Sequence, residues 1–99
     1  MKQTLRISYD DAEKIPKLIA NIKQEIKSSC PKLITDGSRA FRVHWQNFED
    51  DHLQVVVDCH FTIKPTGDEY YDNRQEVLNA IFRAVKKTGV QFEVARNNS

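Results

Sequence analysis

The chain has 99 residues, which is enough for one compact domain with a single core and too few for two. Hydrophobic residues make up 39% of it and charged residues 29%, a composition typical of a folded globular protein rather than of a disordered segment. The 15 Lys and Arg side chains against 14 Asp and Glu leave a net charge of +1, which excludes the strong positive field that would attract nucleic acid or an anionic membrane.

Residues 4–9 form the first predicted strand. Leu5, Ile7 and Tyr9 alternate with polar residues, which is the period-two pattern of a strand with one buried face.

An amphipathic helix is predicted next, ending before Pro31. Asp10 and Asp11 offer an N-cap at its start. Pro16 lacks a backbone donor, so we expect the regular helix to start close to Pro16 or to bend there. The residues at helical spacing that form the apolar stripe are Ile15, Leu18, Ile19, Ile22 and Ile26.

A connector at residues 32–39 leads to a second predicted strand at residues 41–46, and an acidic turn at residues 47–51 follows. The inward residues of this strand are Phe41, Val43 and Trp45.

The clearest strand signal lies at residues 52–64. Apolar residues alternate there with largely polar ones, and this pattern is typical of an antiparallel or mixed sheet with one face exposed to solvent. If the chain folds back about Asp50, Arg42 lies opposite Asp58 and contributes less than ~1 kcal/mol. The predicted inward residues are Leu53, Val55, Val57, Cys59, Phe61 and Ile63, and the outward polar ones are Gln54, Asp58, His60, Thr62 and Lys64.

A second helix is predicted to start near Asp68, after a turn at residues 65–68, and to end at Lys87. Gly89 is expected to take a left-handed conformation that ends the helix, with Val90 packing back on Val85. The predicted apolar stripe is Val77, Leu78, Ile81, Phe82 and Val85, with Ala80 and Ala84 approaching the sheet closely.

A short last strand is predicted at residues 90–94. The order of elements is therefore βαββαβ, which predicts an α+β, ferredoxin-like fold: a mostly antiparallel sheet with two helices on one face. We expect residues 1–99 to form a single domain, with a core at about 3–95 and a polar tail at 96–99.

Cys30 and Cys59 are the two cysteines of the chain. Two cysteines form no disulfide framework, so we expect Cys59 to be a buried free thiol in a reducing compartment. The longest apolar run is residues 55–57, far short of the ~20 residues of a membrane helix. The N-terminus lacks the apolar core of a signal peptide, so we expect neither membrane insertion nor secretion of these 99 residues.

Candidate functional residues are few. His44, Asp58 and His60 fall on the outward face of the predicted sheet, and two histidines with a carboxylate are a weak candidate for a zinc site. Solvated sheet residues explain them better, because no short metal-ligand spacing is present. The acidic runs at 49–51 and 68–69 are explained by a turn and a helix start. We therefore expect no enzyme, no cofactor and no metal.

Three stretches carry a family resemblance: LRISYDD at 5–11 with the following Ile15 and Pro16, RVHWQNF at 42–48 leading through an acidic turn into LQVVV at 53–57, and NRQEV at 73–77, which continues through Ile81 and Ala84 to KKTGV at 86–90. In order and spacing, these stretches resemble the C-terminal α/β domain of the MscS family of small-conductance mechanosensitive channels. The resemblance covers nearly the whole chain.

The resemblance implies a non-enzymatic role as part of a vestibule on the cytoplasmic, or organelle stromal, side of a channel. Such a domain would self-associate within a homo-oligomer and filter solutes, without itself entering the membrane. The resemblance also implies a piece of a longer polypeptide. The alternative from the residues alone is a free-standing ferredoxin-like module that binds a small ligand or metal at His44, Asp58 and His60.

Overall fold

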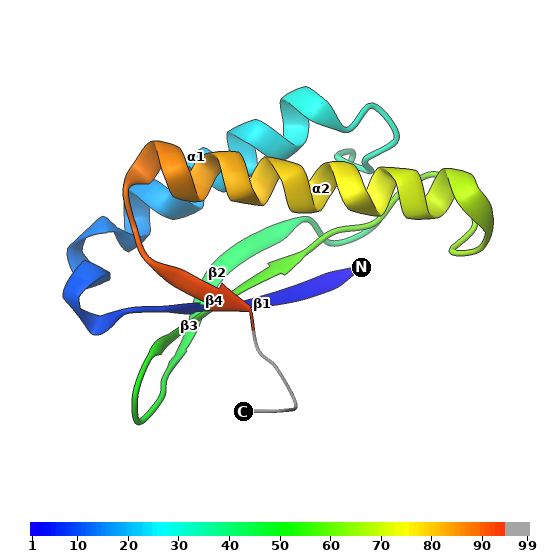
Figure 1. Ribbon diagram of the computed structural model, residues 1–99. Helices are drawn as coiled ribbons and strands as arrows, with labels where there is room; N and C mark the ends of the chain where they lie inside the picture. The colour runs from blue at the N-terminus through cyan, green and yellow to red at the C-terminus, as the bar shows by residue number, and fades with distance from the viewer. Residues whose placement is uncertain (95–99) are drawn as a thin grey trace.

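The computed structural model describes residues 1–94 (Figure 1). Its elements follow the predicted order, with one added 3₁₀ helix, η1. They are β1 (Lys2–Ile7), η1 (Tyr9–Lys14), α1 (Ile15–Ser29), β2 (Arg42–Phe48), β3 (Leu53–Asp58), α2 (Gly67–Thr88) and β4 (Phe92–Val94). Residue 95, the predicted end of the core, and the predicted tail at 96–99 lie outside the described residues.

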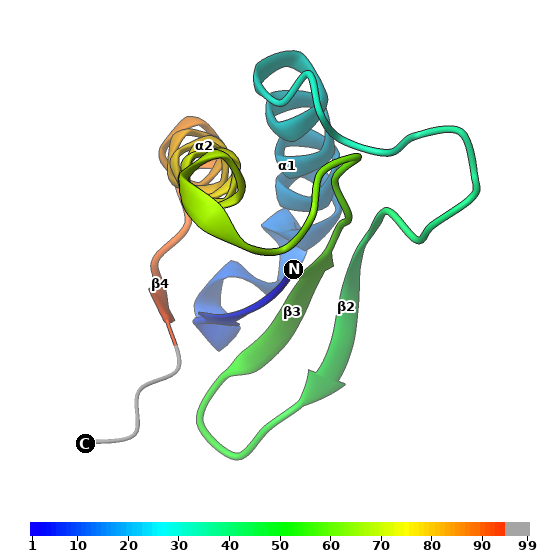
Figure 2. The same cartoon turned by 90° about the vertical axis from the view of Figure 1, so that its right-hand side faces the viewer.

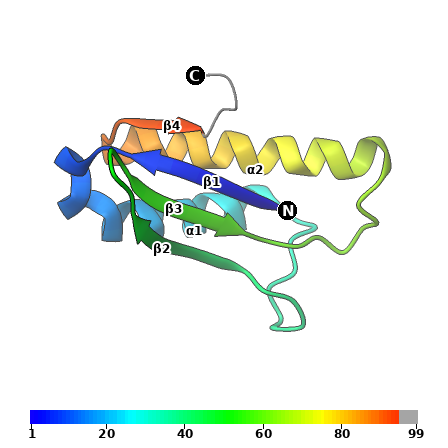
Figure 3. The same cartoon turned by 90° about the horizontal axis from the view of Figure 1, so that it is seen from below.

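The four strands form one sheet in the order β2-β3-β1-β4, and each neighbouring pair is antiparallel. Both helices cover the same face, with α2 on the β4 side and α1 on the β2 side (Figure 2). Seen from below, the sheet leaves its other face uncovered (Figure 3). This topology confirms the ferredoxin-like prediction.

The β2–β3 hairpin has the predicted register, since Arg42 lies opposite Asp58. A β-bulge between Trp45 and Asn47 then shifts the pairing, so that Asn47 faces Gln54. Such an extra residue bends the strand and increases its twist.

The predicted strand at 52–64 is too long, because β3 ends at Asp58. Its partner β1 pairs only as far as Lys2, and one further backbone bond joins the Cys59 amide to the Met1 carbonyl at 3.0 Å. Beyond that point the chain pairs with the connector instead, through a bridge between Leu33 and Phe61.

The predicted first strand at 4–9 is shifted, because β1 ends at Ile7 and η1 follows. Ser8 caps η1 by accepting a hydrogen bond from the Asp10 amide at 3.2 Å, so the prediction of an aspartate cap was wrong. The regular helix α1 begins at Ile15 with Pro16 in its first turn, as predicted.

The core lies between the sheet and the two helices. Leu5, Ile7, Leu53 and Val57 reach it from the strands, and Gly89 ends α2 with φ +80°, as predicted, so that the buried Val90 joins the same core. The residues that α1 and α2 contribute are Ile15, Leu18, Ile22 and Ile26, and Val77, Ala80, Ile81, Ala84 and Val85.

Three burial predictions were wrong. Leu78 is 38% exposed and Phe82 is 54% exposed, because the sheet and α1 cover only the arc of α2 that holds Val77 and Ala80. Tyr9 is also exposed, since it follows the end of β1. Val56, on the face away from the helices, is only 1% exposed and lies between Thr4 and His44 on the neighbouring strands.

Candidate functional site

The weak metal candidate is only partly assembled. Asp58 Oδ1 and His60 Nε2 lie 3.7 Å apart, whereas His44 lies opposite Val56, further along the strand. Within residues 1–94, no group of three His, Cys, Asp or Glu side chains is placed to hold a metal ion. The geometry therefore brings two of the three predicted residues together as a partly exposed pair.

Asp58 lies instead in a cross-strand row of charges on the uncovered face of the sheet. Lys2 of β1 is opposite Asp58 of β3, and Asp58 is opposite Arg42 of β2. Lys2 and Arg42 are exposed. The row makes this end of the uncovered face a solvated, mixed-charge surface.

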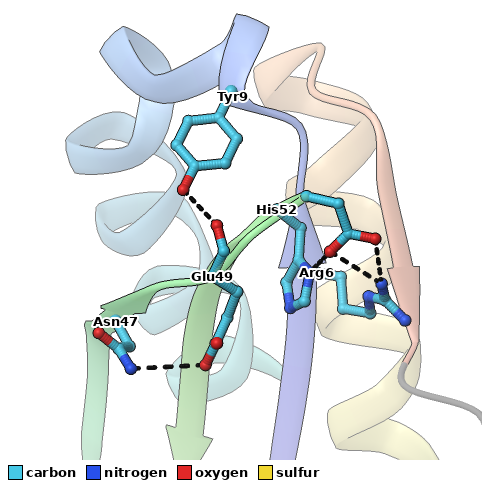
Figure 4. Close-up of polar contacts among 6 residues, drawn as sticks. Arg6, Tyr9, Asn47, Glu49 and His52 are labelled. Atoms are coloured by element: carbon cyan, nitrogen blue, oxygen red, sulfur yellow. Dashed lines mark hydrogen bonds and ion pairs between the residues drawn. The ribbon is translucent and has the colours of Figure 1, made fainter.

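A second polar cluster lies at the opposite end of the sheet, where the β2–β3 turn contacts β1 (Figure 4). Arg6 Nη2 donates to both carboxylate oxygens of Asp51, at 3.1 and 3.4 Å. The Asp51 Oδ1 atom also lies 2.6 Å from His52 Nδ1. Because Arg6 comes from β1, this contact holds the turn against the centre of the sheet.

The Asp51 carboxylate of this cluster is held in place as an anion by Arg6 and His52. The hydrogen bond with His52 and the nearby Arg6 guanidinium lower the pKa of Asp51 below its usual range. Asp51 therefore stays ionised near neutral pH and does not act as a proton donor there. We interpret the cluster as a clamp on the hairpin.

Tyr9 adds a contact from η1 to the same turn. Its hydroxyl donates to the Glu49 carbonyl, and the Asn47 side chain donates to Glu49 Oε1 at 3.4 Å. The sequence analysis missed Arg6 and Tyr9 as partners of the turn, because both contacts join residues about 40 positions apart.

The other side of η1 is tied to the loop after α2. The Gln91 amide donates to Asp11 Oδ2 at 2.8 Å, and Lys14 Nζ donates to the Gly89 carbonyl at 3.1 Å. The hairpin turn, η1 and the α2–β4 loop are thus connected by hydrogen bonds, which hold the three segments in fixed positions relative to one another.

Large apolar side chains are exposed in two places. The first, which we call the hairpin patch, consists of Tyr9, Trp45 and Phe48; Phe48 is 66% exposed, and its ring centroid lies 4.9 Å from that of the partly buried Trp45.

The second, which we call the α2 stripe, consists of Tyr71, Leu78 and Phe82, with Lys86 Nζ 5.6 Å from the Phe82 ring centroid. Interface centres are enriched in aromatic residues, so both surfaces are candidate contact sites.

The two cysteines are free and buried, as expected for Cys59. Burial raises the pKa of Cys59 to about 11 and also raises that of Cys30. Raised pKa values make both thiols poor nucleophiles, because the thiolate is the reactive form.

Comparison with known proteins assigns the fold to a family. The family model described as "Mechanosensitive ion channel MscS, C-terminal" matches residues 4–92. "Mechanosensitive ion channel protein 1, mitochondrial" of Arabidopsis thaliana is 26% identical over 93 residues, which cover 94% of this chain and 18% of that protein. None of the helices described in residues 1–94 has the length and apolar character needed to cross a membrane.

Solved structures agree on the fold. Two cryo-EM structures of MSL1, one titled wild type and one from Arabidopsis thaliana, superimpose with TM-scores of 0.75 and 0.78 at 24% identity. Each alignment covers 96% of this chain but only about a third of the other, 32% and 33%. The family is one of ion channels rather than of enzymes. From the match over residues 4–92, the chain belongs to the MscS family of mechanosensitive ion channels and corresponds to its C-terminal domain.

Proposed function

We propose that residues 1–99 form a single vestibule domain of an MscS-like mechanosensitive channel. The domain conducts nothing itself; it helps to assemble the channel by packing against copies of itself, and it filters the solutes that reach the pore. The observation that carries the proposal is the family match over residues 4–92, which includes both helices, β2, β3 and most of β1.

Two structural features support the assembly role. The hairpin patch and the α2 stripe expose large apolar side chains at two separate places, and such surfaces are typical of protein contacts. The charge of the chain is close to balanced, so contacts between copies meet little net repulsion.

The uncovered face of the sheet supports the filtering role. Helices cover the other face, and the uncovered strands carry Lys2 and Arg42 beside Asp58, while Arg6 is paired with Asp51 and lies opposite Glu93 of β4. Charged side chains along a solvated surface act on the ions that pass it, and the sign of their net charge sets which ions are favoured. We propose that this face lies toward the solution that enters the channel from the cytoplasmic or stromal side.

The location is tested with an antibody against the domain and fractionated source cells. We expect a band much larger than a 99-residue chain that stays with membranes through an alkaline carbonate wash and is released by detergent. A band of the size of the 99-residue chain in the soluble fraction would overturn the proposal.

The filtering role is tested by Arg42→Glu in the full channel, with the reversal potential measured under a salt gradient. We expect a shift toward cation permeation. Lys17→Glu on the exposed face of α1 is the matched control, since it changes the charge equally but lies on the helix layer. Equal shifts in both variants would contradict a special role for the uncovered face.

A further inference from the structure

We propose that the α2 stripe of one copy docks on the hairpin patch of the next copy, in a head-to-tail contact. The inference rests on the proposed function, because it names the surfaces through which copies of this domain meet. Among residues 1–91, the part of the chain whose side-chain burial is described, the large exposed apolar side chains fall into these two groups: Tyr9 and Phe48, and Tyr71, Leu78 and Phe82.

The stripe is continuous along α2. Tyr71, Leu78 and Phe82 are spaced by seven and four residues, which places them on one side of the helix over about 16 Å. This side faces away from α1, because α2 contacts α1 through Arg83, which donates to Glu25 at 3.0 Å, and through Thr88. The stripe is therefore the outer flank of the helix layer.

The two surfaces differ in charge. Lys86 lies over the Phe82 ring at the C-terminal end of the stripe, whereas Tyr71 at the other end has Asp68, Asp72 and Arg74 nearby on the helix. The acidic residues Asp10, Glu49 and Asp50 directly follow Tyr9 and Phe48 of the hairpin patch in the sequence. The Phe82 end of the stripe, with Lys86, is therefore complementary in charge to the acidic residues beside the hairpin patch.

Their positions in the fold also differ. The hairpin patch includes Trp45 and Phe48 of β2, which is one edge of the sheet, whereas α2 lies over the β4 side (Figures 2 and 3). A contact between two different surfaces of identical copies is heterologous, and repetition of such a contact closes a ring when the rotation allows it. A self-complementary contact would instead stop at a dimer.

The hairpin patch is also held in shape before any contact. The Arg6–Asp51 and Tyr9–Glu49 hydrogen bonds fix the turn against β1 and η1. A contact surface that is already ordered loses less conformational entropy on association. Trp45 is further held by its Nε1, which donates to the Asn47 carbonyl at 3.2 Å.

Site-specific cross-linking of the 99-residue chain tests the contact. One batch carries Phe48→Cys and the other Phe82→Cys, and the two are mixed at millimolar concentration under mild oxidation. Cys30 and Cys59 are buried, so the unsubstituted chain gives the background. We expect at least fivefold more covalent dimer from the mixture than from either batch alone.

Each other result overturns the contact. More dimer from Phe82→Cys alone would mean that α2 flanks pair with each other. An equal yield when Phe48→Cys is mixed with Lys23→Cys, an exposed position on α1, would mean collision without a preferred partner. No dimer above background at millimolar concentration would mean that the surfaces do not meet.

Charge reversal gives a second readout by sedimentation velocity. Lys86→Glu and Glu49→Lys should each weaken association by about two- to fivefold, as expected for charges at the rim of a contact. The double variant should recover the original association, because the opposite charges again face each other. Failure of the double variant to recover would contradict the assigned pairing.

These outcomes are separate from those of the fractionation experiment. A membrane-held native protein without the 48–82 cross-link would retain the proposed function and overturn the head-to-tail contact. A small soluble native protein that forms the cross-link would do the reverse.

Discussion

Asn21 of α1 donates a hydrogen bond from Nδ2 to Thr88 Oγ1 of α2 at 2.9 Å, and Thr88 Oγ1 in turn donates to the Ala84 carbonyl at 2.7 Å. Asn21 is 8% exposed and is the buried polar residue of the part of the chain that the structure describes. The pair joins the two helices where α2 ends, and its geometry satisfies an amide that would otherwise be costly to bury.

We predict that Thr88→Val lowers the free energy of unfolding by about 1–3 kcal/mol, because it leaves the Asn21 amide without its acceptor. Urea denaturation followed by circular dichroism measures the change. The double variant Asn21→Leu and Thr88→Val removes both partners and should be more stable than Thr88→Val alone. A double variant that loses more than the single one would contradict this account.

Asp51 predicts a pH dependence of stability. Its pKa is lowered in the folded chain, so its contribution is fully present above the unfolded pKa, about 3.9, and is lost as the pH falls through the folded value. We expect Asp51→Asn to lower Tm at pH 7 and to have the same Tm as the original chain at pH 2. Asp50→Asn is the control and should have little effect at either pH. A constant difference between the Asp51 variant and the original chain across this range would contradict the assignment.

The buried thiols predict slow modification. With a pKa raised to about 11, Cys59 has only about 0.1% thiolate at pH 8, and its side chain is 0% exposed. Ellman's reagent should therefore react with Cys59 only on unfolding, and with the 3% exposed Cys30 slowly in the native chain. Rapid reaction of both thiols in the folded chain would contradict the structure.

The same pKa shift has a consequence at high pH. Because the folded pKa of Cys59 exceeds the value of 9.0 in the absence of burial, the unfolded chain loses this proton first, and stability falls as the pH rises from 9.0 toward about 11. Cys59→Ala removes this contribution, so its Tm should fall less steeply over this range than that of the original chain. Parallel slopes for the two chains would contradict the prediction.

Adjacent positions on α2 should differ sharply in their effect on stability. Ile81→Ala removes a side chain that is 3% exposed and should cost about 2–5 kcal/mol. Phe82→Gln removes one that is 54% exposed and should change the free energy of unfolding by about 0.5 kcal/mol or less. Equal losses in urea denaturation would mean that Phe82 belongs to the core after all.

Periodicity predicted the sheet well because each strand has one buried face. The alternation of Leu53, Val55 and Val57 fixed which side of β3 meets the helices, and the acidic turn fixed the register that pairs Arg42 with Asp58. The same reasoning gave the left-handed Gly89, since this backbone conformation favours glycine.

The exposed surfaces could not be predicted in the same way. The apolar residues of α2 occupy a wide arc, and sequence alone does not tell which edge of that arc faces the sheet, so Leu78 and Phe82 were assigned to the core. The Arg6–Asp51 clamp depends on the pairing of β1 with β3, which brings together residues 45 positions apart. Patterns of hydrophobicity over a few residues do not predict a contact between side chains so far apart in the sequence.

The bulge between Trp45 and Asn47 determines how the outer strand β2 can be used. A regular edge strand presents an unbroken row of backbone donors and acceptors, which invites another chain to extend the sheet without limit. The extra residue at Gln46 interrupts that row and turns the strand away from a flat edge. Growth into a fibre by addition of strands at β2 is thereby opposed.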